Sequence, residues 1–349
     1  LKATIIHLKN ELTKFRKKPL IVCQIKSIID DKAIIKLPNG NNFLVEISNH
    51  LIGKLKIHDE ILAEQRSLTI VDRLETSKNY DVESFVTVEK PNISWEQIGG
   101  LKEQINEIKE VIELPLTKPE IFEKVGIEPP KGILLYGPPG SGKTLLAKAV
   151  AASTNATFIE VVASELNQKY IGEGAKLVRD IFKLAKERAP SIIFIDEMDA
   201  LASERIDMGT SGEREVQRTF MQFLAELDGF KPLGNVKLIG ATNRIDALDQ
   251  ALLRPGRLDR LIEINLPNKE EREDIFKIHS KNMNLNNINF KDLVEETENL
   301  SGADIRLVCT EAGYNAIRSN RHNINQNDFV TAIKKVKVEE EDDHMTMFG

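Results

Sequence analysis

A glycine-rich run that ends in lysine and threonine offers the clearest chemistry in this 349-residue sequence. Residues 137–144 read Gly-Pro-Pro-Gly-Ser-Gly-Lys-Thr, a spacing in which glycines let backbone N–H groups surround bound phosphates. Lys143 would then reach the β- and γ-phosphates of a nucleotide, and Thr144 would ligate Mg²⁺. The residues predicted to contact the nucleotide here are Pro139, Gly140, Ser141, Gly142, Lys143, Thr144 and Leu145.

A second candidate follows the apolar run 192–195, which ends in the acids Asp196 and Glu197. At the carboxyl end of a buried parallel strand, both acids would lie beside the phosphate loop. Asp196 suits a Mg²⁺ partner, and Glu197 suits a base that polarises an attacking water. An Asp-Glu pair after an apolar strand is often only a helix start, but the loop upstream favours the catalytic interpretation.

A third polar side chain, Asn243, follows the apolar run 236–241. It could orient the water or the γ-phosphate. The run Asn243-Arg-Ile-Asp246 is superficially like the guanine-reading Asn-Lys-x-Asp. A small GTPase would also carry Asp-x-x-Gly after its second strand, whereas Asp196 is followed by Glu, Met and Asp. We therefore reject guanine as the base.

These side chains require strands that alternate with helices. The alternation predicts an α/β domain over residues 92–267, and nearly continuous apolar runs indicate parallel strands covered on both faces. The strands are predicted at 132–136, 157–162, 191–195, 236–241 and 261–265. Residues 268–338 carry only helical patterns, at 269–281, 303–318 and 326–336, and residues 339–349 are predicted to form a flexible tail.

The N-terminal part differs in pattern. Apolar residues recur at heptad spacing at Leu1, Ile5, Leu8, Leu12 and Phe15. Residues 1–18 are therefore interpreted as the end of a coiled coil, or alternatively as an amphipathic helix packed on its own domain. Pro19 would end this helix. Because the chain starts at Leu1 and not at Met, we expect a missing N-terminal stretch.

Residues 19–75 are predicted to form a small five-stranded OB-type barrel. The strands are expected at 20–25, 33–37, 43–47, 60–63 and 68–71, with a hairpin turn at Asn39-Gly40. Nucleic-acid binding would need exposed aromatic residues and a basic groove. Only Phe43 is aromatic in this segment and no basic cluster is present, so a structural role is favoured. Residues 76–91 are predicted to be a linker.

Composition restricts the function further. The formal net charge is −6, and no apolar run is long enough to cross a bilayer. Neither nucleic acid nor a membrane is therefore expected as a partner. The cysteines, Cys23 and Cys309, lie in apolar surroundings and suit inert thiols in a reducing, cytoplasmic compartment.

Together the motifs resemble those of AAA+ ATPases. The most specific ones are residues 137–144, Asp196-Glu197, Leu-Arg-Pro-Gly-Arg-Leu-Asp-Arg at 253–260, Lys-Tyr-Ile-Gly at 169–172 and Ser-Gly-Ala-Asp at 301–304. The order of coiled coil, barrel, α/β domain and helical lid is similar to the proteasome-activating nucleotidases and the proteasomal regulatory-particle ATPases. The resemblance implies ATP and Mg²⁺ as cofactors. It also implies a hexameric ring, of one protein or of paralogues, that unfolds proteins and feeds them into the proteasome core particle.

The resemblance also assigns residues to the site. Arg254 and Arg257 match arginine fingers that reach the γ-phosphate bound in the next subunit, although such arginines could instead be salt-bridged surface residues. Residues 228–230 match an inter-subunit signalling segment. Ile98, Gly99 and His279 match the adenine-lining positions. Gly302 and Ala303 match the contact on the lid side. A merely packed side chain is the alternative for His279.

Further matches concern substrate and partner. Tyr170, between Lys169 and Ile171, matches an aromatic pore loop that grips unfolded chains, and residues 211–215 match a second pore loop. Pro19 matches a proline that takes cis and trans forms in alternate subunits. The family ends in a tail that docks into the core particle. Here the end is Met347, Phe348 and Gly349, which lacks the tyrosine hydroxyl of that motif, so a non-docking end remains an alternative.

Rival functions fit less well. A membrane-bound AAA+ metalloprotease would show His-Glu-x-x-His, and no histidine is followed by Glu. A helicase or clamp loader would use the barrel on nucleic acid. The intact Lys143, Asp196 and Glu197 argue against a non-catalytic scaffold. The best alternative is a related unfolding ATPase that works without the core particle.

Overall fold

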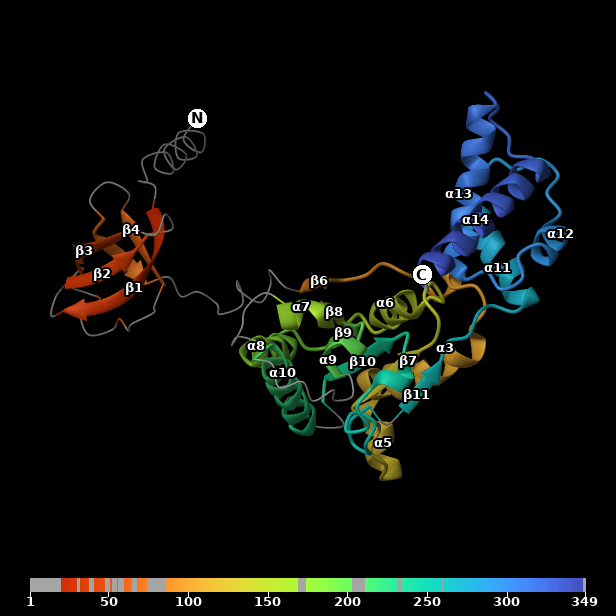
Figure 1. Cartoon of the computed structure of the whole chain (residues 1–349). Coiled ribbons are helices and arrows are strands. Elements are labelled where there is room, and N and C mark those ends of the chain that lie inside the picture. The colour runs from red at the N-terminus through yellow and green to blue at the C-terminus, as the bar shows by residue number, and fades with distance from the viewer. Residues whose placement is uncertain are drawn as a thin grey trace, which may run out of the picture. The chain divides into compact units, whose positions relative to one another are not determined.

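The computed structural model describes residues 20–29, 32–37, 41–47, 51, 55, 60–64, 68–73, 86–168, 174–202, 211–230, 234–258 and 260–347. The chain forms two compact units, Leu1–Tyr80 and Asp81–Gly349 (Figure 1). Some predictions fall outside the described residues. They are the heptad helix at 1–18, Pro19, the hairpin turn at 39–40, the linker as far as residue 85, the pore loop at 169–171 and the terminal pair 348–349.

The N-terminal unit contains the five predicted strands. They are β1 (Leu20–Ile29), β2 (Lys32–Lys36), β3 (Asn42–Glu46), β4 (Glu60–Glu64) and β5 (Ile70–Arg73). Neighbouring strands are antiparallel, in the order β3-β2-β1-β4-β5. An isolated parallel bridge between Ile47 and Ile70 joins the ends of this order. Alternate residues such as Cys23 and Ile25 are buried, so one face of the sheet forms the core of this unit.

The second unit is built on a six-stranded sheet in the order β11-β7-β10-β9-β8-β6. The five predicted strands are confirmed as β7 (Gly132–Tyr136), β8 (Thr157–Val162), β9 (Ser191–Asp196), β10 (Val236–Thr242) and β11 (Arg260–Glu263), and all pair in parallel. The prediction of a linker as far as residue 91 is wrong, because β6 (Thr87–Glu89) pairs antiparallel with β8. Lys148 binds Glu89 on β6 at 3.0 Å and Glu160 on β8 at 2.9 Å, which holds this short strand to the sheet edge.

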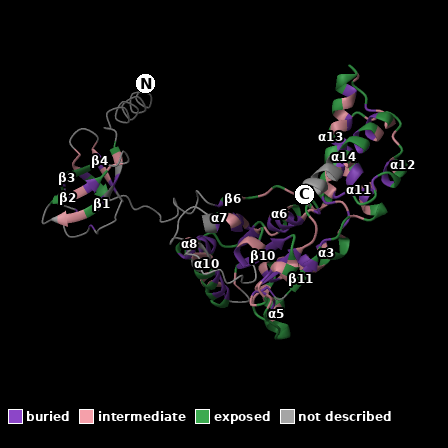
Figure 2. Cartoon of the chain, in the orientation of Figure 1, coloured by how far each residue is buried: buried purple, intermediate pink, exposed green. Residues whose placement is uncertain are grey.

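Helices cover both faces of this sheet, and its four central strands, β7 to β10, are mostly buried (Figure 2). On β7, Leu134 belongs to the core on one face, while Ile133 and Leu135 belong to the core on the other. One face is covered by α7 (Ala163–Gln168), α8 (Gly174–Glu187), α9 (Asp199–Ala202) and α10 (Ser211–Asp228). The other is covered by α3 (Lys102–Ile108), the π-helical η2 (Lys109–Glu113) and α6 (Lys143–Ser153). The shorter connections contain η1 (Trp95–Gln97), α4 (Leu114–Thr117), α5 (Pro119–Val125) and η3 (Ile245–Ala247).

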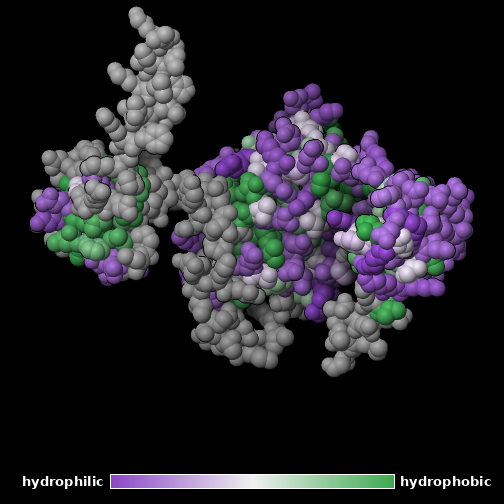
Figure 3. Space-filling model, turned by 90° about the horizontal axis from the view of Figure 1, so that it is seen from above, coloured by the Kyte–Doolittle hydropathy of each residue, from purple (hydrophilic) through white to green (hydrophobic). Residues whose placement is uncertain are grey.

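A helical lid follows the sheet domain, and Figure 3 shows hydrophilic side chains over most of its visible face. It contains α11 (Lys269–Ser280), α12 (Phe290–Glu295), α13 (Gly302–Arg318) and α14 (Gln326–Met347), packed around a core that includes Phe276 and Phe329. The helix predicted at 326–336 continues as far as Met347, into the segment 339–349 that is predicted to be a flexible tail. Residues 326–347 contain neither glycine nor proline, so nothing in the sequence interrupts α14.

Candidate nucleotide-binding and catalytic site

The glycine-rich loop connects β7 directly to α6, as predicted. Gly137 has φ 147°, and a Cβ there would collide with the carbonyl oxygen of Ile264, so only glycine fits. Gly142, with φ 100°, precedes the first residue of α6. The loop therefore presents its backbone at the N-terminal end of a helix, where N–H groups and the helix dipole favour a bound phosphate.

Lys143 lies inside this loop. Its Nζ donates hydrogen bonds to the carbonyl oxygens of Gly137 at 2.9 Å and Pro138 at 2.7 Å. Burial lowers the pKa of the Lys143 ammonium, and the nearby Asp196 carboxylate opposes that shift. The ammonium is thus preorganised in the phosphate loop by groups that a bound phosphate can replace.

The C-terminal end of β9 and the N-terminal end of α6 bring together the side chains of Thr144, Asp196 and Glu197. Thr144 Oγ1 donates to Asp196 Oδ2 at 3.2 Å, and the Glu197 N–H donates to Asp196 Oδ1 at 2.9 Å. Glu197 has φ 52°, a conformation that is uncommon for residues other than glycine. Ser164 Oγ donates to Glu197 Oε2 at 3.3 Å. A hydroxyl and a carboxylate side by side are oxygen ligands of the kind that Mg²⁺ prefers, so this pair fits the ion.

Asn243 lies at the end of the adjacent strand, β10. The preceding residue, Thr242, donates through Oγ1 to Asp199 Oδ1 at 2.7 Å and accepts from the Arg244 N–H at 3.0 Å. Its carbonyl oxygen accepts from the Gly137 N–H at 3.3 Å. These bonds fix the backbone on either side of Asn243 against the phosphate loop.

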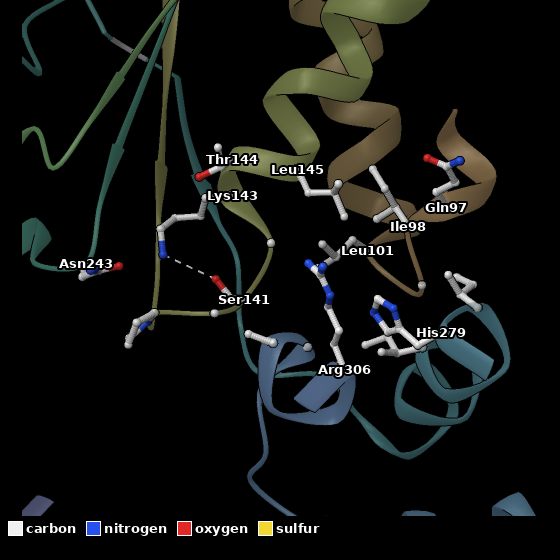
Figure 4. A pocket seen from close by; sticks show the side chains of 18 of the residues that line it. Gln97, Ile98, Leu101, Ser141, Lys143, Thr144, Leu145, Asn243, His279 and Arg306 are labelled. Carbon is white, nitrogen blue, oxygen red and sulfur yellow. Dashed lines mark hydrogen bonds between the residues drawn. The ribbon is translucent and has the colours of Figure 1, made fainter. Parts of the chain in front are cut away.

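One cavity of about 440 Å³ collects the predicted nucleotide residues (Figure 4). Its lining includes the residues predicted from the sequence, namely Ile98, Gly99, Pro139, Gly140, Ser141, Gly142, Lys143, Thr144, Leu145, Asp196, Glu197, Asn243, His279, Gly302 and Ala303. It also includes five that sequence reasoning missed, namely Gln97, Leu101, Ile275, Ile278 and Arg306. Ile275 and Ile278 could have been found from their helical spacing to His279, whereas no local signal marks Leu101.

The lid closes one side of the cavity. The Ala303 N–H donates to the Gly140 carbonyl at 3.1 Å. Gly140 has φ 72°, and a Cβ there would lie 2.5 Å from Ser301 Oγ. Across the cavity, the Leu101 N–H donates to Glu271 Oε1 at 3.1 Å. Glu271 also completes the N-terminal cap of α11, so this one carboxylate links the lid to the segment before α3.

His279 lies on α11 at the lid side of the cavity. Burial lowers the pKa of its imidazole, and the positive charge of Arg306 lowers it further. The ring is therefore neutral at pH 7 and can both donate and accept a hydrogen bond.

Comparison with known proteins decides the family. The chain is 57% identical to a proteasome-activating nucleotidase of Sulfurisphaera tokodaii over 94% of this chain and 85% of the relative. It is 58% identical to a proteasome-activating nucleotidase of Archaeoglobus fulgidus, over 91% of this chain and 81% of the relative.

The chain belongs to the proteasome-activating nucleotidase family. A third relative of the same name, from Saccharolobus solfataricus, is 52% identical over 97% of this chain and 87% of its own length. Residues 133–266 match the model of the ATPase family associated with various cellular activities, and residues 287–331 match the AAA+ lid domain. The chain is thus a nucleotide-binding AAA+ ATPase.

In this AAA+ ATPase the two predicted arginine fingers lie away from the cavity of their own subunit. Arg254 is exposed. Arg257 donates through Nε and a terminal nitrogen to both carboxylate oxygens of Asp228, each at 2.8 Å, and its other nitrogen donates to the Ala251 carbonyl at 2.6 Å. This pairing raises the pKa of Arg257 and lowers the pKa of Asp228.

Other predicted residues give less information. The pore residues Lys169, Tyr170 and Ile171 lie outside the described residues. The second pore-loop segment falls at the start of α10, which begins at Ser211. Met347 is the last residue of α14. Within the described part of the chain, no helix is long and apolar enough to span a membrane.

Proposed function

We propose that this ATPase is a ring-shaped protein unfoldase and translocase that feeds substrates into the proteasome core particle and opens its gate. The observation that carries this proposal is the extent of the likeness to the proteasome-activating nucleotidases. The likeness covers 94% of the chain at 57% identity. A match of this length includes the N-terminal unit and is not confined to the ATPase domain. An unfolding ATPase that works without the core particle is less favoured, because the relatives are named for activating the proteasome.

For the hydrolysis step we assign roles from the cavity. Thr144 and Asp196 would hold Mg²⁺, which supplies charge neutralisation on the phosphates. Lys143 exchanges its bonds with the Gly137 and Pro138 carbonyls for phosphate oxygens. Glu197, at the end of β9, polarises the attacking water. Asn243, held by the bonds around Thr242, orients that water or the γ-phosphate.

The residues that surround the adenine of the nucleotide are assigned in the same way, from the lining of the cavity. Ile98 and Gly99 line one side of the adenine, and His279, Gly302 and Ala303 line the lid side. A neutral His279 can hydrogen-bond the edge of the base.

Arg254 and Arg257 act in the next subunit of a hexameric ring, formed by copies of this chain or by paralogues. Neither arginine lines the cavity of its own chain, which supports action in trans. Among the described lining residues, Lys143 is the only cationic side chain at the phosphate end of the cavity. An arginine supplied in this way accelerates phosphoryl transfer by about 10³–10⁵. Hydrolysis therefore depends on assembly.

The remaining parts are assigned to substrate and partner handling in the cytoplasm. Lys169, Tyr170 and Ile171 form a pore loop that grips unfolded chains. The N-terminal unit is an OB-type barrel, supported by its strand order and by the Ile47–Ile70 bridge that joins the ends of the sheet. Residues 1–18 form the end of a coiled coil, with Pro19 at its boundary. Met347, Phe348 and Gly349 dock into the α-ring of the core particle.

An unfolding assay beside an ATPase assay tests the translocase proposal. Tyr170→Ala should leave ATP turnover within about twofold of the parent and abolish unfolding of a stably folded tagged protein. The reason is that the aromatic side chain of Tyr170 contacts substrate and not phosphate. The control is Tyr314→Ala, on the exposed surface of the lid. Tyr136→Ala would be unsuitable, because Tyr136 directly precedes the nucleotide loop. Normal unfolding by Tyr170→Ala would show that another segment pulls the substrate.

A further inference from the structure

The base end of the nucleotide cavity contains one charged side chain that the assignments above leave without a role. The acids of the cavity, Asp196 and Glu197, lie at the phosphate end. The opposite end is lined mainly by apolar side chains such as Ile98, Leu101 and Ile275. Arg306 also lines this end.

The start of α13 determines where Arg306 points. Ser301 and Asp304 form a reciprocal cap at the helix N-terminus, and the Ala303 N–H bonds to Gly140 in the phosphate loop. Arg306 lies one turn further along α13. Its side chain therefore extends from the lid into the cavity, beside His279, as Figure 4 shows.

Arg306 differs from the other lid arginines in its contacts. Arg321 pairs with Asp328 at 2.6 Å, Arg318 lies 3.7 Å from Glu311, and Arg272 is buried with bonds to backbone carbonyls. Arg306 is exposed, and no carboxylate among the described residues lies within ion-pair distance of it. Its charge is nevertheless felt at His279, where it helps to keep the ring neutral.

We propose that Arg306 is a nucleotide-binding residue of the lid, whose planar guanidinium stacks on the face of the adenine base. The inference rests on the proposed placement of the base at this end of the cavity. A guanidinium attracts the face of an aromatic ring and is less strongly hydrated than an ammonium, so it suits a partly apolar pocket. Ile98 and Leu101 offer apolar surface from the sheet domain. Stacking by Arg306 would thus join the lid to the base in addition to the Gly140–Ala303 contact.

Equilibrium binding of ATP and of adenosine to the whole 349-residue chain tests the proposal. Arg306→Ala should weaken both ligands by a similar factor of about 5 to 30, since stacking involves only the base. Arg318→Ala, on the same helix, should leave both affinities unchanged. Equal affinity of Arg306→Ala and the parent for adenosine would overturn the proposal, and so would a loss confined to ATP, which would indicate a phosphate contact.

Two further variants keep the test decisive. If Arg306→Ala does not fold, Arg306→Lys retains the charge and the stem but not the planar group, and should still weaken adenosine binding. Full adenosine affinity in Arg306→Lys would also overturn the proposal. Lys143→Met should abolish ATP binding and leave adenosine binding unchanged. A failure of that pattern would reject the proposed orientation of the nucleotide, separately from the role of Arg306.

Discussion

Arg257 holds both carboxylate oxygens of Asp228 at 2.8 Å, so the predicted arginine finger is tied to residues 228–230 of its own subunit. Lys131 adds to this arrangement by donating to the carbonyl oxygens of Leu227 and Asp228 at 3.1 and 3.2 Å. The end of α10 and the segment that carries Arg257 are therefore joined. A movement of either segment would shift the guanidinium.

Asp228→Ala should lower ATP turnover of the assembled ring by about tenfold to a hundredfold, because small misplacements of a catalytic group have effects of this size. Nucleotide affinity should not change, since neither partner lines the cavity. Steady-state ATPase and equilibrium ATP binding check this. Asp246→Ala, at the exposed Arg244–Asp246 pair, is the control. Unchanged turnover in Asp228→Ala would mean that the ion pair does not position Arg257.

The phosphate loop and the acid pair should separate binding from hydrolysis. Lys143→Met should abolish ATP binding, because it removes the buried ammonium of the loop. Glu197→Gln should bind ATP like the parent and lose about 10²–10⁴ in turnover, the usual contribution of a general base. Single-turnover hydrolysis with bound ATP measures the second effect. Comparable turnover in Glu197→Gln and the parent would remove Glu197 as the base.

Gly140→Ala should weaken ATP binding by about tenfold or more. The new Cβ would lie 2.5 Å from Ser301 Oγ and would displace the N-terminus of α13 from the loop. Gly126→Ala is a matched control, since Gly126 also has positive φ, at 77°, but open space around the added Cβ. It should lower the free energy of unfolding by about 1 kcal/mol and leave ATP affinity intact. Equal ATP affinities for the two variants would show that the close approach of Gly140 to Ser301 is not needed for ATP binding.

Adenosine affinity should depend on pH through His279. Burial and the charge of Arg306 lower the imidazole pKa from its usual 6.5, so in the folded protein the ring gains its proton only at a pH below that of a free histidine. Affinity should be constant from about pH 8 to about pH 6.5 and fall below it, as the ring becomes protonated. The unfolded chain binds a proton more readily in this range, so the free energy of unfolding should also decrease as the pH falls below about 6.5. His279→Gln should remove this pH dependence of adenosine binding, and a persistent dependence would point to another group.

Much of the fold and the site could be predicted from local patterns. Apolar runs with polar ends predict β7, β9 and β10, and the residues at those ends meet in one cavity. The three residues of β6 are too few to show a strand period, so their pairing with β8 could not be foreseen. The bond from Leu101 to Glu271 joins positions 170 residues apart, and no local signal reports such a contact. Arg306 was missed for a related reason, because only the docking of α13 on Gly140 turns it toward the cavity.

The most direct measurement of the central claim is the release of a short fluorogenic peptide from purified proteasome core particles in the presence of ATP. The intact chain should stimulate release, and deletion of residues 347–349 should remove most of that stimulation while ATP turnover stays unchanged. Phe348→Tyr should strengthen it, because the added hydroxyl can make a further hydrogen bond. Stimulation by the deleted form equal to that of the intact chain would contradict docking through this end. No stimulation by the intact chain, with normal ATPase and unfolding activity, would contradict the account as a whole and favour an unfoldase that works without the core particle.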